Sequence, residues 1–218
     1  MPIESAKNRG YFKIKSAASA FNFDFKGKTV LDIGSSTGGF TQYALEHGAA
    51  KVIAVEKGTN QMVSPLRHDP RVELHEKTDI FDFGITDIPS SGRSERPSSR
   101  GSSLRPRSSC GCPSEGISVI LADVSFISLT KVLAYAKKHL ANRGTEFLVM
   151  VKPQFEANEA ELNRGIVKNE KIRREILKRF EIWLKQNDFF IVDKHDNELK
   201  GKNGNKERFY LLKLAKTN

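Results

Sequence analysis

A glycine-rich segment, Leu31-Asp-Ile-Gly34-Ser-Ser-Thr-Gly38-Gly39-Phe40, follows an apolar β-rich run and precedes a segment with helical periodicity. In an open α/β sheet such a turn lies outside the carboxyl ends of the strands, where ligands bind. Its glycines allow the backbone to approach a ligand closely. The spacing departs from the G-x-G-x-x-G pattern of dinucleotide-binding proteins, so a pyrophosphate is not required. The segment predicts a nucleoside-binding loop.

Apolar runs and helical patterns alternate on both sides of this loop. We expect these elements in the order strand 29–33, helix 40–47, strand 51–55, strand 72–75, strand 119–122, helix 129–140, strand 147–151 and helix 170–184. The strand runs are nearly continuously apolar, as in strands buried on both faces of a parallel sheet. Two last runs, 189–192 and 209–214, flank a turn-rich connection and favour a hairpin. The sequence predicts an α/β fold with a doubly wound, mostly parallel, Rossmann-like sheet and an antiparallel C-terminal edge hairpin.

The composition favours a nucleic-acid partner and argues against a membrane span. The chain has 218 residues, which suits one domain over 1–218 with 1–25 as a lead-in that carries a short helix. No apolar run approaches bilayer length, and 1–7 lack the apolar stretch of a secretory signal, so we expect a cytoplasmic protein without a membrane partner. Lys and Arg number 36 against 26 Asp and Glu, a net charge of +10. This balance favours RNA.

Cysteine and histidine usage points to no disulfide framework and no metal site. Cys110 and Cys112 are the two cysteines, and they are too close in sequence to staple a domain. The five histidines show no ligand spacing with them or with each other.

Residues 89–116 differ in composition from the rest of the chain. They contain ten Ser, four Pro, four Gly, five Arg and no Lys. Such a segment cannot bury enough surface to offset its ordering, so we expect a disordered insertion. An RNA-binding loop and a translated frame error are the alternatives. The five Arg and two Glu of the segment give +3, which leaves +7 of the +10 on the other residues.

Two carboxylates follow predicted strands near the glycine loop. Glu56 comes 22 residues after Gly34 and ends the second strand, where it can accept hydrogen bonds from both ribose hydroxyls. Asp79 follows the third strand, and it either accepts from an adenine amino group or serves as a helix cap or surface carboxylate. S-adenosylmethionine suits this pocket better than NAD, because no second nucleotide half is indicated and the charged residues downstream suit methyl transfer.

A second group of charged residues also follows the strands. Asp123 and Lys152 end two adjacent apolar runs, so both side chains should emerge at the ligand edge. A structural ion pair is one interpretation, because a buried ammonium is costly unless it is paired. In the other interpretation, a lysine beside carboxylates orients or deprotonates a ribose hydroxyl near a bound sulfonium. Glu207, at the start of the last strand, is placed to close the group, whereas spacing alone gives the weakest placement to Lys13, which lies before a short helical stripe.

At these residues the sequence resembles the TlyA family of hemolysin-like proteins, 2′-O-ribose rRNA methyltransferases related to the FtsJ/RrmJ methyltransferases. The resemblance covers nearly everything except 89–116. Its motifs are Arg9-Gly-Tyr-Phe-Lys13, Leu31-Asp-Ile-Gly-Ser-Ser-Thr-Gly-Gly-Phe-Thr41, Ala54-Val-Glu-Lys-Gly58 with Gln61, Leu66-Arg-His-Asp-Pro-Arg-Val72, Asp123-Val-Ser-Phe-Ile-Ser-Leu129, Val151-Lys-Pro-Gln-Phe-Glu156 and Arg164-Gly-Ile-Val-Lys168.

The resemblance implies a methyltransferase that uses S-adenosyl-L-methionine and acts on ribosomal RNA or ribosomal subunits. It maps the family's Lys-Asp-Lys-Glu tetrad to Lys13, Asp123, Lys152 and Glu207. The implied cofactor residues are Gly34, Ser35, Ser36, Thr37, Gly38, Gly39, Phe40, Glu56, Asp79 and Asp123, with Asp123 near the methionine amino group. We expect the family's N-terminal RNA-binding module to be absent from this chain.

Three alternative functions remain open. The first is a catalytically weak methyltransferase fold that serves as an RNA-binding or ribosome-assembly factor. The second is a pore-forming hemolysin, which no signal or amphipathic membrane segment supports. The third is a small-molecule methyltransferase, which leaves the positive charge unexplained.

Overall fold

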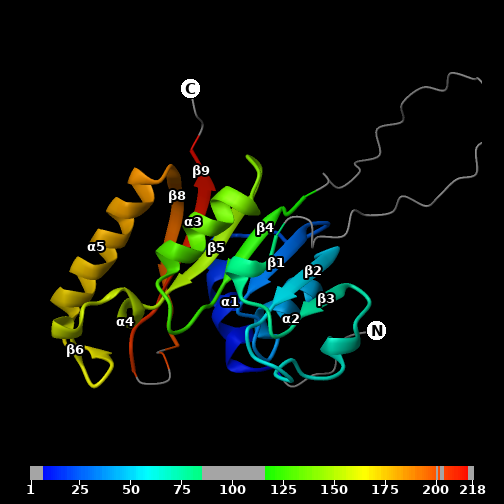
Figure 1. The fold of residues 1–218 in the computed structure, drawn as a ribbon, viewed down its shortest axis with the longest axis horizontal. Helices are drawn as coiled ribbons and strands as arrows, with labels where there is room; N and C mark the ends of the chain where they lie inside the picture. The colour runs from blue at the N-terminus through cyan, green and yellow to red at the C-terminus, as the bar shows by residue number, and fades with distance from the viewer. Residues whose placement is uncertain (1–6, 85–115, 200, 202–203, 216–218) are drawn as a thin grey trace, which may run out of the picture.

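A seven-stranded sheet lies between two layers of helices in the computed structural model, which describes residues 7–84, 116–199, 201 and 204–215 (Figure 1). The strand order is β3-β2-β1-β4-β5-β9-β8. The strands are β1 Thr29–Ile33, β2 Lys51–Val55, β3 Val72–His75, β4 Val119–Ala122, β5 Glu146–Val151, β8 Phe189–Asp196 and β9 Arg208–Leu214. The pairs among β1 to β5 are parallel, whereas β9 runs antiparallel to both β5 and β8. The predicted mostly parallel sheet with an antiparallel C-terminal hairpin is confirmed.

Three helices, α2 Gly39–Glu46, α3 Leu129–His139 and α5 Glu170–Gln186, lie at the predicted positions with shifts of one or two residues at their ends. Helix α1 Arg9–Ala20 is the short helix expected within residues 1–25, and a further short helix is α4 Pro153–Glu156. The sequence patterns did not predict α4 or a small hairpin of β6 Leu162–Asn163 and β7 Ile166–Val167, because elements this short carry no periodicity. Short 3-10 turns cover Leu66–His68, Ile80–Asp82 and Glu159–Glu161.

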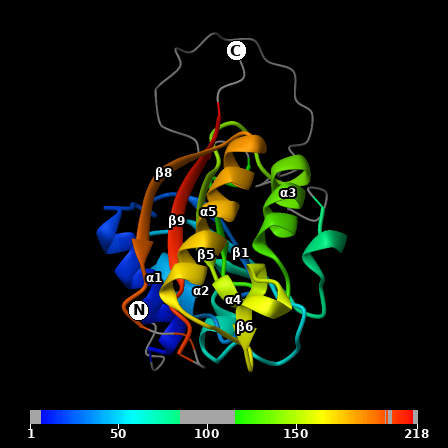
Figure 2. The same cartoon turned by 90° about the vertical axis from the view of Figure 1, so that its left-hand side faces the viewer.

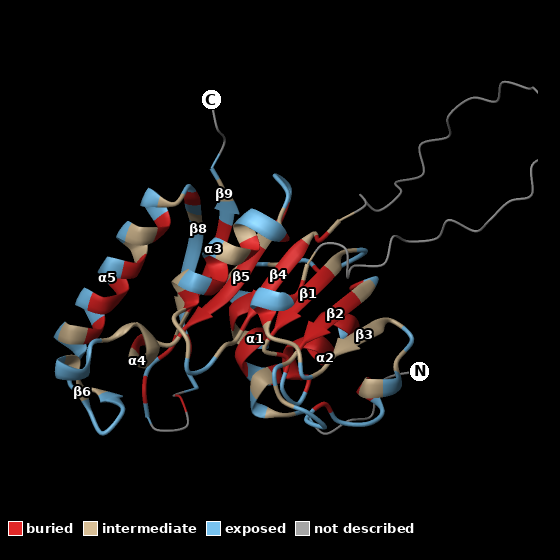
Figure 3. Cartoon of the chain, in the orientation of Figure 1, coloured by how far each residue is buried: buried red, intermediate tan, exposed pale blue. Residues whose placement is uncertain are grey.

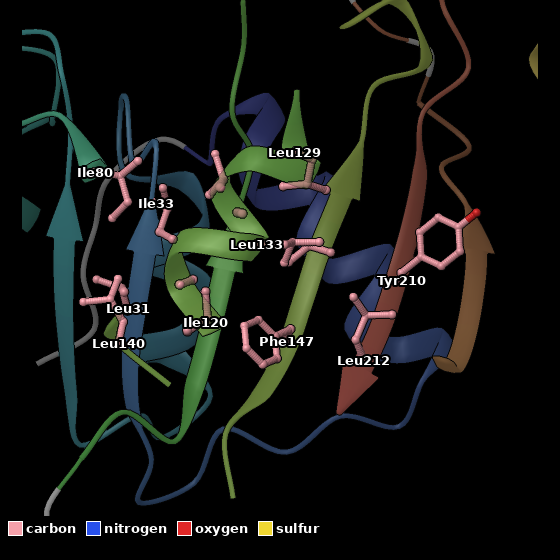
Figure 4. Close-up of a cluster of buried hydrophobic side chains, with 14 of the residues drawn as sticks. Leu31, Ile33, Ile80, Ile120, Leu129, Leu133, Leu140, Phe147, Tyr210 and Leu212 are labelled. Atoms are coloured by element: carbon pink, nitrogen blue, oxygen red, sulfur yellow. The ribbon is translucent and has the colours of Figure 1, made fainter. Parts of the chain in front are cut away.

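Successive residues of the central strands pack into two different cores. Leu31 and Ile33 of β1 contribute to the core beneath α3 and α5, whereas Val30 contributes to the core beneath α1 and α2. Figure 4 shows the first core, with Leu133 of α3 lying over Ile120 and Phe147 of the sheet. This alternation follows from the two-residue period of a strand. Because both faces are covered, the strands are apolar at nearly every position.

Helix α5 has one buried face and one exposed face (Figure 3). Ile176, Phe180 and Leu184 are buried against the sheet. Asn169 begins the helix by accepting a hydrogen bond from the backbone N–H of Ile172. The buried face also holds Arg173, whose guanidinium donates to Asp196 at 2.6 Å. A count of apolar residues does not reveal this buried arginine.

Strand β8 extends four residues beyond the predicted 189–192. Its register shifts between Ile191 and Asp193, and most residues after the shift are exposed. At a sheet edge the outer face meets water, so polar residues continue the strand without an apolar pattern.

The structure bears only in part on two predictions, the disordered insertion and the lack of a membrane span, because it does not describe every residue. Of the segment 89–116, only Gly116 is described, so the expected disorder lies outside these residues. Within the described part of the chain, no helix combines the length and the apolar character that a bilayer crossing requires.

Candidate active site

A pocket of about 810 Å³ lies at the carboxyl ends of β1, β2 and β4. This volume is in the usual range for small-molecule and cofactor sites. Its polar wall includes five of the predicted cofactor residues, Gly34, Ser36, Glu56, Asp79 and Asp123. Its apolar wall includes Ile80, Ile127 and Val132. A pocket with a carboxylate rim and an aliphatic wall suits the ribose and base of a nucleoside.

The first turn of the pocket is held by backbone contacts. Gly34 has φ +79, and a Cβ at this position would lie 3.1 Å from the carbonyl oxygen of Asp123. The glycine therefore lets the end of β1 touch the end of β4. Ser36 donates its backbone N–H to Glu56 at 2.9 Å, and Gly58 donates its own at 2.6 Å. Gln61 Nε2 adds a long bond of 3.5 Å to Oε1, so Glu56 is fixed in orientation while its Oε2 retains a further lone pair for a ribose hydroxyl.

The remaining predicted loop residues lie outside the pocket wall. They are Ser35, Thr37, Gly38, Gly39 and Phe40. Gly39 permits close packing of α1 on α2, because a Cβ there would lie 2.6 Å from the backbone nitrogen of Tyr11. Thr37 accepts a hydrogen bond from Asn8, and Phe40 is buried beneath α1 and α2. These five residues support the turn from the side away from the pocket, and their contact with a cofactor stays a prediction.

Asp79 performs the capping role that the sequence left as one alternative. Its carboxylate accepts from the backbone N–H of Phe81 and pairs with Lys57 Nζ at 2.9 Å. The bond from Lys57 lowers the pKa of Asp79. Asp79 also lines the pocket, so the adenine contact stays a prediction.

Asp32 is a buried carboxyl that the sequence reasoning did not single out. Thr41 Oγ1 donates to its Oδ2 at 2.6 Å, and its Oδ1 has no hydrogen-bond partner among the described residues. Burial raises the pKa of Asp32 to about 7 against the effect of the Thr41 bond. The residue lies within the glycine-loop motif, but its single polar position in an apolar strand carried no spacing signal.

Lys152 and Asp123 form an ion pair at the pocket edge. The Nζ of Lys152 lies 2.6 Å from Asp123 Oδ1 and 2.8 Å from Ser125 Oγ. The exposed fractions of the two side chains are 11% for Lys152 and 20% for Asp123. Asp123 lines the pocket and keeps partial access to water, whereas Lys152 stands behind it and is nearly buried.

Lys13 and Glu207 form a second ion pair, also of 2.6 Å. Their side chains are 9% and 3% exposed. Lys13 comes from α1, and Glu207 immediately precedes β9. Asn197 lies 3.5 Å from Glu207 and adds a weak hydrogen bond.

The sheet register places the two ion pairs side by side. Val151 of β5 is paired with Arg208 of β9, so the next antiparallel positions bring Lys152 opposite Glu207. Met150 and Phe209 both lie in the core beneath α1 and α2. By the two-residue alternation, Lys152 and Glu207 face this same side. The four predicted tetrad residues therefore meet at one edge of the sheet.

Glu156 ties the two loops that carry the Lys152–Asp123 pair. It ends α4, and its carboxylate accepts from Ser128 Oγ and from the backbone N–H of Leu129, each at 2.6 Å. Burial raises the pKa of Glu156 against these two bonds. The residue stands in a quoted family motif, but no sequence spacing reveals a contact with a helix start 27 residues earlier.

An aromatic pair stands at the mouth of the site. Phe126 is 92% exposed and has φ +66, a left-handed backbone that is unusual for a bulky residue. Its ring centroid lies 5.3 Å from that of Phe155. Phe126 lies in the loop after β4, and Phe155 lies in helix α4, which follows β5. The exposed ring of Phe126, with the half-buried ring of Phe155 beside it, offers a stacking surface at this edge.

The described residues contain no candidate metal site. Across 7–84, 116–199, 201 and 204–215, no three His, Cys, Asp or Glu side chains are grouped so that they could hold a metal ion.

Comparisons with known proteins identify the family. Residues 6–214 match the model of the FtsJ-like methyltransferase family. Hemolysin A of Brachyspira hyodysenteriae is 36% identical over 89% of this chain and 71% of its own length. The 23S rRNA (cytidine-2′-O)-methyltransferase TlyA of Campylobacter jejuni is 33% identical over 93% of this chain and 69% of its own length. A solved structure from Streptococcus thermophilus gives a TM-score of 0.81 at 30% identity, over 98% of this chain and 70% of that one.

These matches confirm the predicted resemblance and fold. The cofactor of such methyltransferases, S-adenosylmethionine, agrees with the pocket described above. The chain is therefore an S-adenosylmethionine-dependent methyltransferase of the FtsJ-like family, in the group that includes TlyA and hemolysin A.

Proposed function

We propose that this chain methylates the 2′-hydroxyl of a ribose in ribosomal RNA, in the cytoplasm where ribosomal subunits are found. The observation that carries the proposal is the Lys152–Asp123 pair, in which Asp123 lines the nucleoside pocket and Lys152 stands next to the Lys13–Glu207 pair. The curated relatives include TlyA of Mycobacterium tuberculosis, named a 16S/23S rRNA (cytidine-2′-O)-methyltransferase, at 31% identity.

The pocket residues suit the cofactor. Glu56 would accept the ribose hydroxyls, and Asp79 would accept the adenine amino group. Asp123 would hold the methionine amino group, with the backbone of Gly34 and Ser36 along the same wall. Ile80 and Val132 offer aliphatic surface for the base. When bound, S-adenosylmethionine supplies a methyl group on a positively charged sulfur.

Lys152 is the residue placed to act on the target hydroxyl. A ribose hydroxyl is too weak an acid to ionise near neutral pH, so it needs a positioned group that accepts its proton. Lys152 would fill this role as a neutral amine: its ammonium first gives one proton to water, the amine then takes the hydroxyl proton as the oxygen attacks the methyl group, and the sulfur leaves as a neutral thioether. Lys152 Nζ is held by Asp123 and Ser125 and therefore has a fixed place at the pocket rim. Alignment of the hydroxyl for in-line attack supplies much of the rate, about 7 to 11 kcal/mol in favourable cases.

The other two tetrad residues act through position and charge. Glu207 lies across the strand pair from Lys152, and Lys13 neutralises Glu207 at 2.6 Å. An unpaired Glu207 would place a buried negative charge beside Lys152 and bias its proton affinity. We assign Lys13 and Glu207 as positioning residues.

RNA suits the surroundings of this site. The net charge is +10, and Phe126 and Phe155 offer a stacking surface beside the reacting pair. A small-molecule substrate would need neither feature.

The proposal is tested with purified protein, S-adenosylmethionine carrying a labelled methyl group, and unmodified ribosomal RNA or subunits. The expected product is a nucleoside labelled on its 2′ oxygen after complete digestion. Label on a base, or no label under conditions where the cofactor binds, would overturn the proposal.

A further inference from the structure

Exposed Lys and Arg side chains gather at the β6–β7 hairpin and along helix α5, and none of them belongs to the tetrad. Arg164 stands exposed at the turn of the β6–β7 hairpin with φ +48, and Lys168 stands exposed just after β7. Among the described residues Arg164 has no ion-pair partner, and Lys168 bonds only to the carbonyl oxygen of Ala160. Neither side chain is used to stabilise a neighbouring carboxylate.

Helix α5 continues this basic surface. Lys171, Arg174 and Lys178 are exposed and lie at positions three and four residues apart, which places them along one face of the helix. Within the described residues no carboxylate forms an ion pair with any of the three. The acids at the two flanks of the face are engaged elsewhere, since Glu170 pairs with Arg173 and Glu181 pairs with Lys194.

One exposed acid interrupts the pattern. Glu175 lies on the edge of the same helix face and forms no ion pair within the described residues. The five cations, Arg164, Lys168, Lys171, Arg174 and Lys178, which we name the α5 basic face, still outnumber it. The face keeps a positive charge of +4.

The α5 basic face begins next to the reacting lysine. A cavity of about 160 Å³ is lined by Pro153, Ile166, Asn169 and Lys206 among others, so it joins the residue after Lys152 to the hairpin and to the start of α5. Figure 2 shows α4, β6 and the start of α5 together at the lower edge of the sheet, and Figure 1 agrees. From Lys171 to Lys178 the face runs about 10 Å along the helix axis.

We propose that the α5 basic face binds the phosphates of the RNA strand beside the target nucleotide. The inference rests on the proposed function, which places a ribose at Lys152. A strand that leaves this ribose meets the hairpin first and α5 next. Flexible ammonium and guanidinium groups that form no ion pair with a carboxylate of the described residues suit phosphates, because they exchange bound counterions for phosphate contacts. An acidic protein surface is the other possible anion, and the experiment separates the two.

The test uses two triple variants that remove equal charge. Lys171→Gln, Arg174→Gln and Lys178→Gln are combined in the first. Lys26→Gln, Lys138→Gln and Arg143→Gln are combined in the second, the matched control, because these three are exposed at the opposite edge of the sheet and form no ion pair within the part of the chain that the structure describes. Affinity for an unmodified ribosomal RNA fragment is measured at several salt concentrations, together with KM and kcat for methyl transfer.

In the α5 variant the slope of log affinity against log salt should become shallower by about 2, because each lost phosphate contact with a single strand removes about 0.7 from its magnitude. Its KM for RNA should rise at least tenfold at physiological salt, while kcat at saturating RNA and affinity for the cofactor stay within twofold. The control should keep the wild-type slope and KM. Equal slopes and KM values in the two variants would overturn the inference and leave an acidic protein as the partner of the face.

The outcome is separable from that of the proposed function. If the wild-type protein transfers no methyl group to ribosomal RNA, the proposed function fails, and the salt slopes alone then decide the inference. If the triple variant does not fold, Lys171→Gln alone is used, with an expected slope change of about 0.7.

Discussion

The two ion pairs of the active site have the same length and different surroundings. Lys13–Glu207 and Lys152–Asp123 are both 2.6 Å long. The two lysines are almost equally exposed, at 9% for Lys13 and 11% for Lys152, so the difference lies in the carboxylates: Glu207 is 3% exposed, whereas Asp123 is 20% exposed and lines the open pocket. A closed pair leaves no room for a substrate and fixes the position of its neighbours. An open pair can exchange a contact for a substrate hydroxyl, so we assign the chemistry to Lys152 and the support to Lys13.

The largest expected effect is on turnover. Lys152→Ala should lower kcat for methyl transfer by at least 1,000-fold, because it removes the group that accepts the hydroxyl proton and fixes the alignment. The affinity for S-adenosylmethionine, measured by calorimetry, should change by less than threefold. Lys138→Ala, an exposed lysine on α3, is the control and should match the wild type. A Lys152→Ala enzyme with a tenth of the wild-type rate would remove Lys152 from this role.

The second prediction concerns stability, to which the Lys13–Glu207 pair should contribute more than the Lys152–Asp123 pair. Lys13→Ala leaves Glu207 as an uncompensated buried charge, which costs about 3 to 5 kcal/mol. Lys152→Ala leaves Asp123 within reach of water and should cost about 1 kcal/mol. Urea unfolding measures both. The double variant Lys13→Met with Glu207→Leu should recover most of the loss, and equal costs for the two single variants would contradict the contrast between a closed and an open pair.

A buried carboxyl without a cation sharpens the comparison. Asp32 has a pKa of about 7 in the folded protein against an ordinary value of 3.8. Between about pH 4 and pH 7 the folded state holds a proton that the unfolded chain has released, so this group favours folding at low pH and loses that contribution as pH rises to 7. The loss is up to about 4 kcal/mol.

Asp32→Asn should remove this pH dependence. The difference in unfolding free energy between wild type and variant is measured from pH 4 to pH 8, and it should shift steadily against the wild type up to about pH 7 and then level off. Asp24→Asn, at an exposed position, is the control. A difference that stays constant with pH would show that Asp32 is ionised throughout.

The smallest expected effect concerns the tie between the loops of the open pair. Glu156→Gln keeps the size of the side chain but weakens the bonds to Ser128 and Leu129, which hold the Asp123 loop against the Lys152 loop. We expect kcat to fall about tenfold, with a stability loss of about 1 to 2 kcal/mol. Glu159→Gln, exposed and three residues away, should leave kcat unchanged. A change in KM alone would contradict a positioning role.

Much of the fold was readable because burial on both faces leaves a strong pattern. The runs at 29–33 and 51–55 are strands in the structure with the predicted bounds. The end of β8 was not predicted, since an edge strand exposes polar residues. Arg173 was not predicted as buried because its partner Asp196 belongs to a different element.

The site residues likewise divide into those that the strand pattern predicted and those that it missed. Glu56, Asp123 and Lys152 were predicted from their places after apolar strands, because strand ends meet at one edge in a parallel sheet. The contact of Lys13 with Glu207 joins the two ends of the chain, and only the family resemblance pointed to it. Glu156 was missed because a cap that comes from a distant loop leaves no local pattern.

The central claim, that Lys152 performs the chemistry from an open ion pair, is tested most directly by amine rescue. The single-turnover rate of methyl transfer to unmodified ribosomal RNA is measured for Lys152→Ala at saturating cofactor and RNA, with and without added methylamine. We predict that the rate falls at least 1,000-fold and rises with amine concentration, whereas Lys13→Ala gains nothing from the amine. A Lys152→Ala rate within tenfold of the wild type would contradict the account.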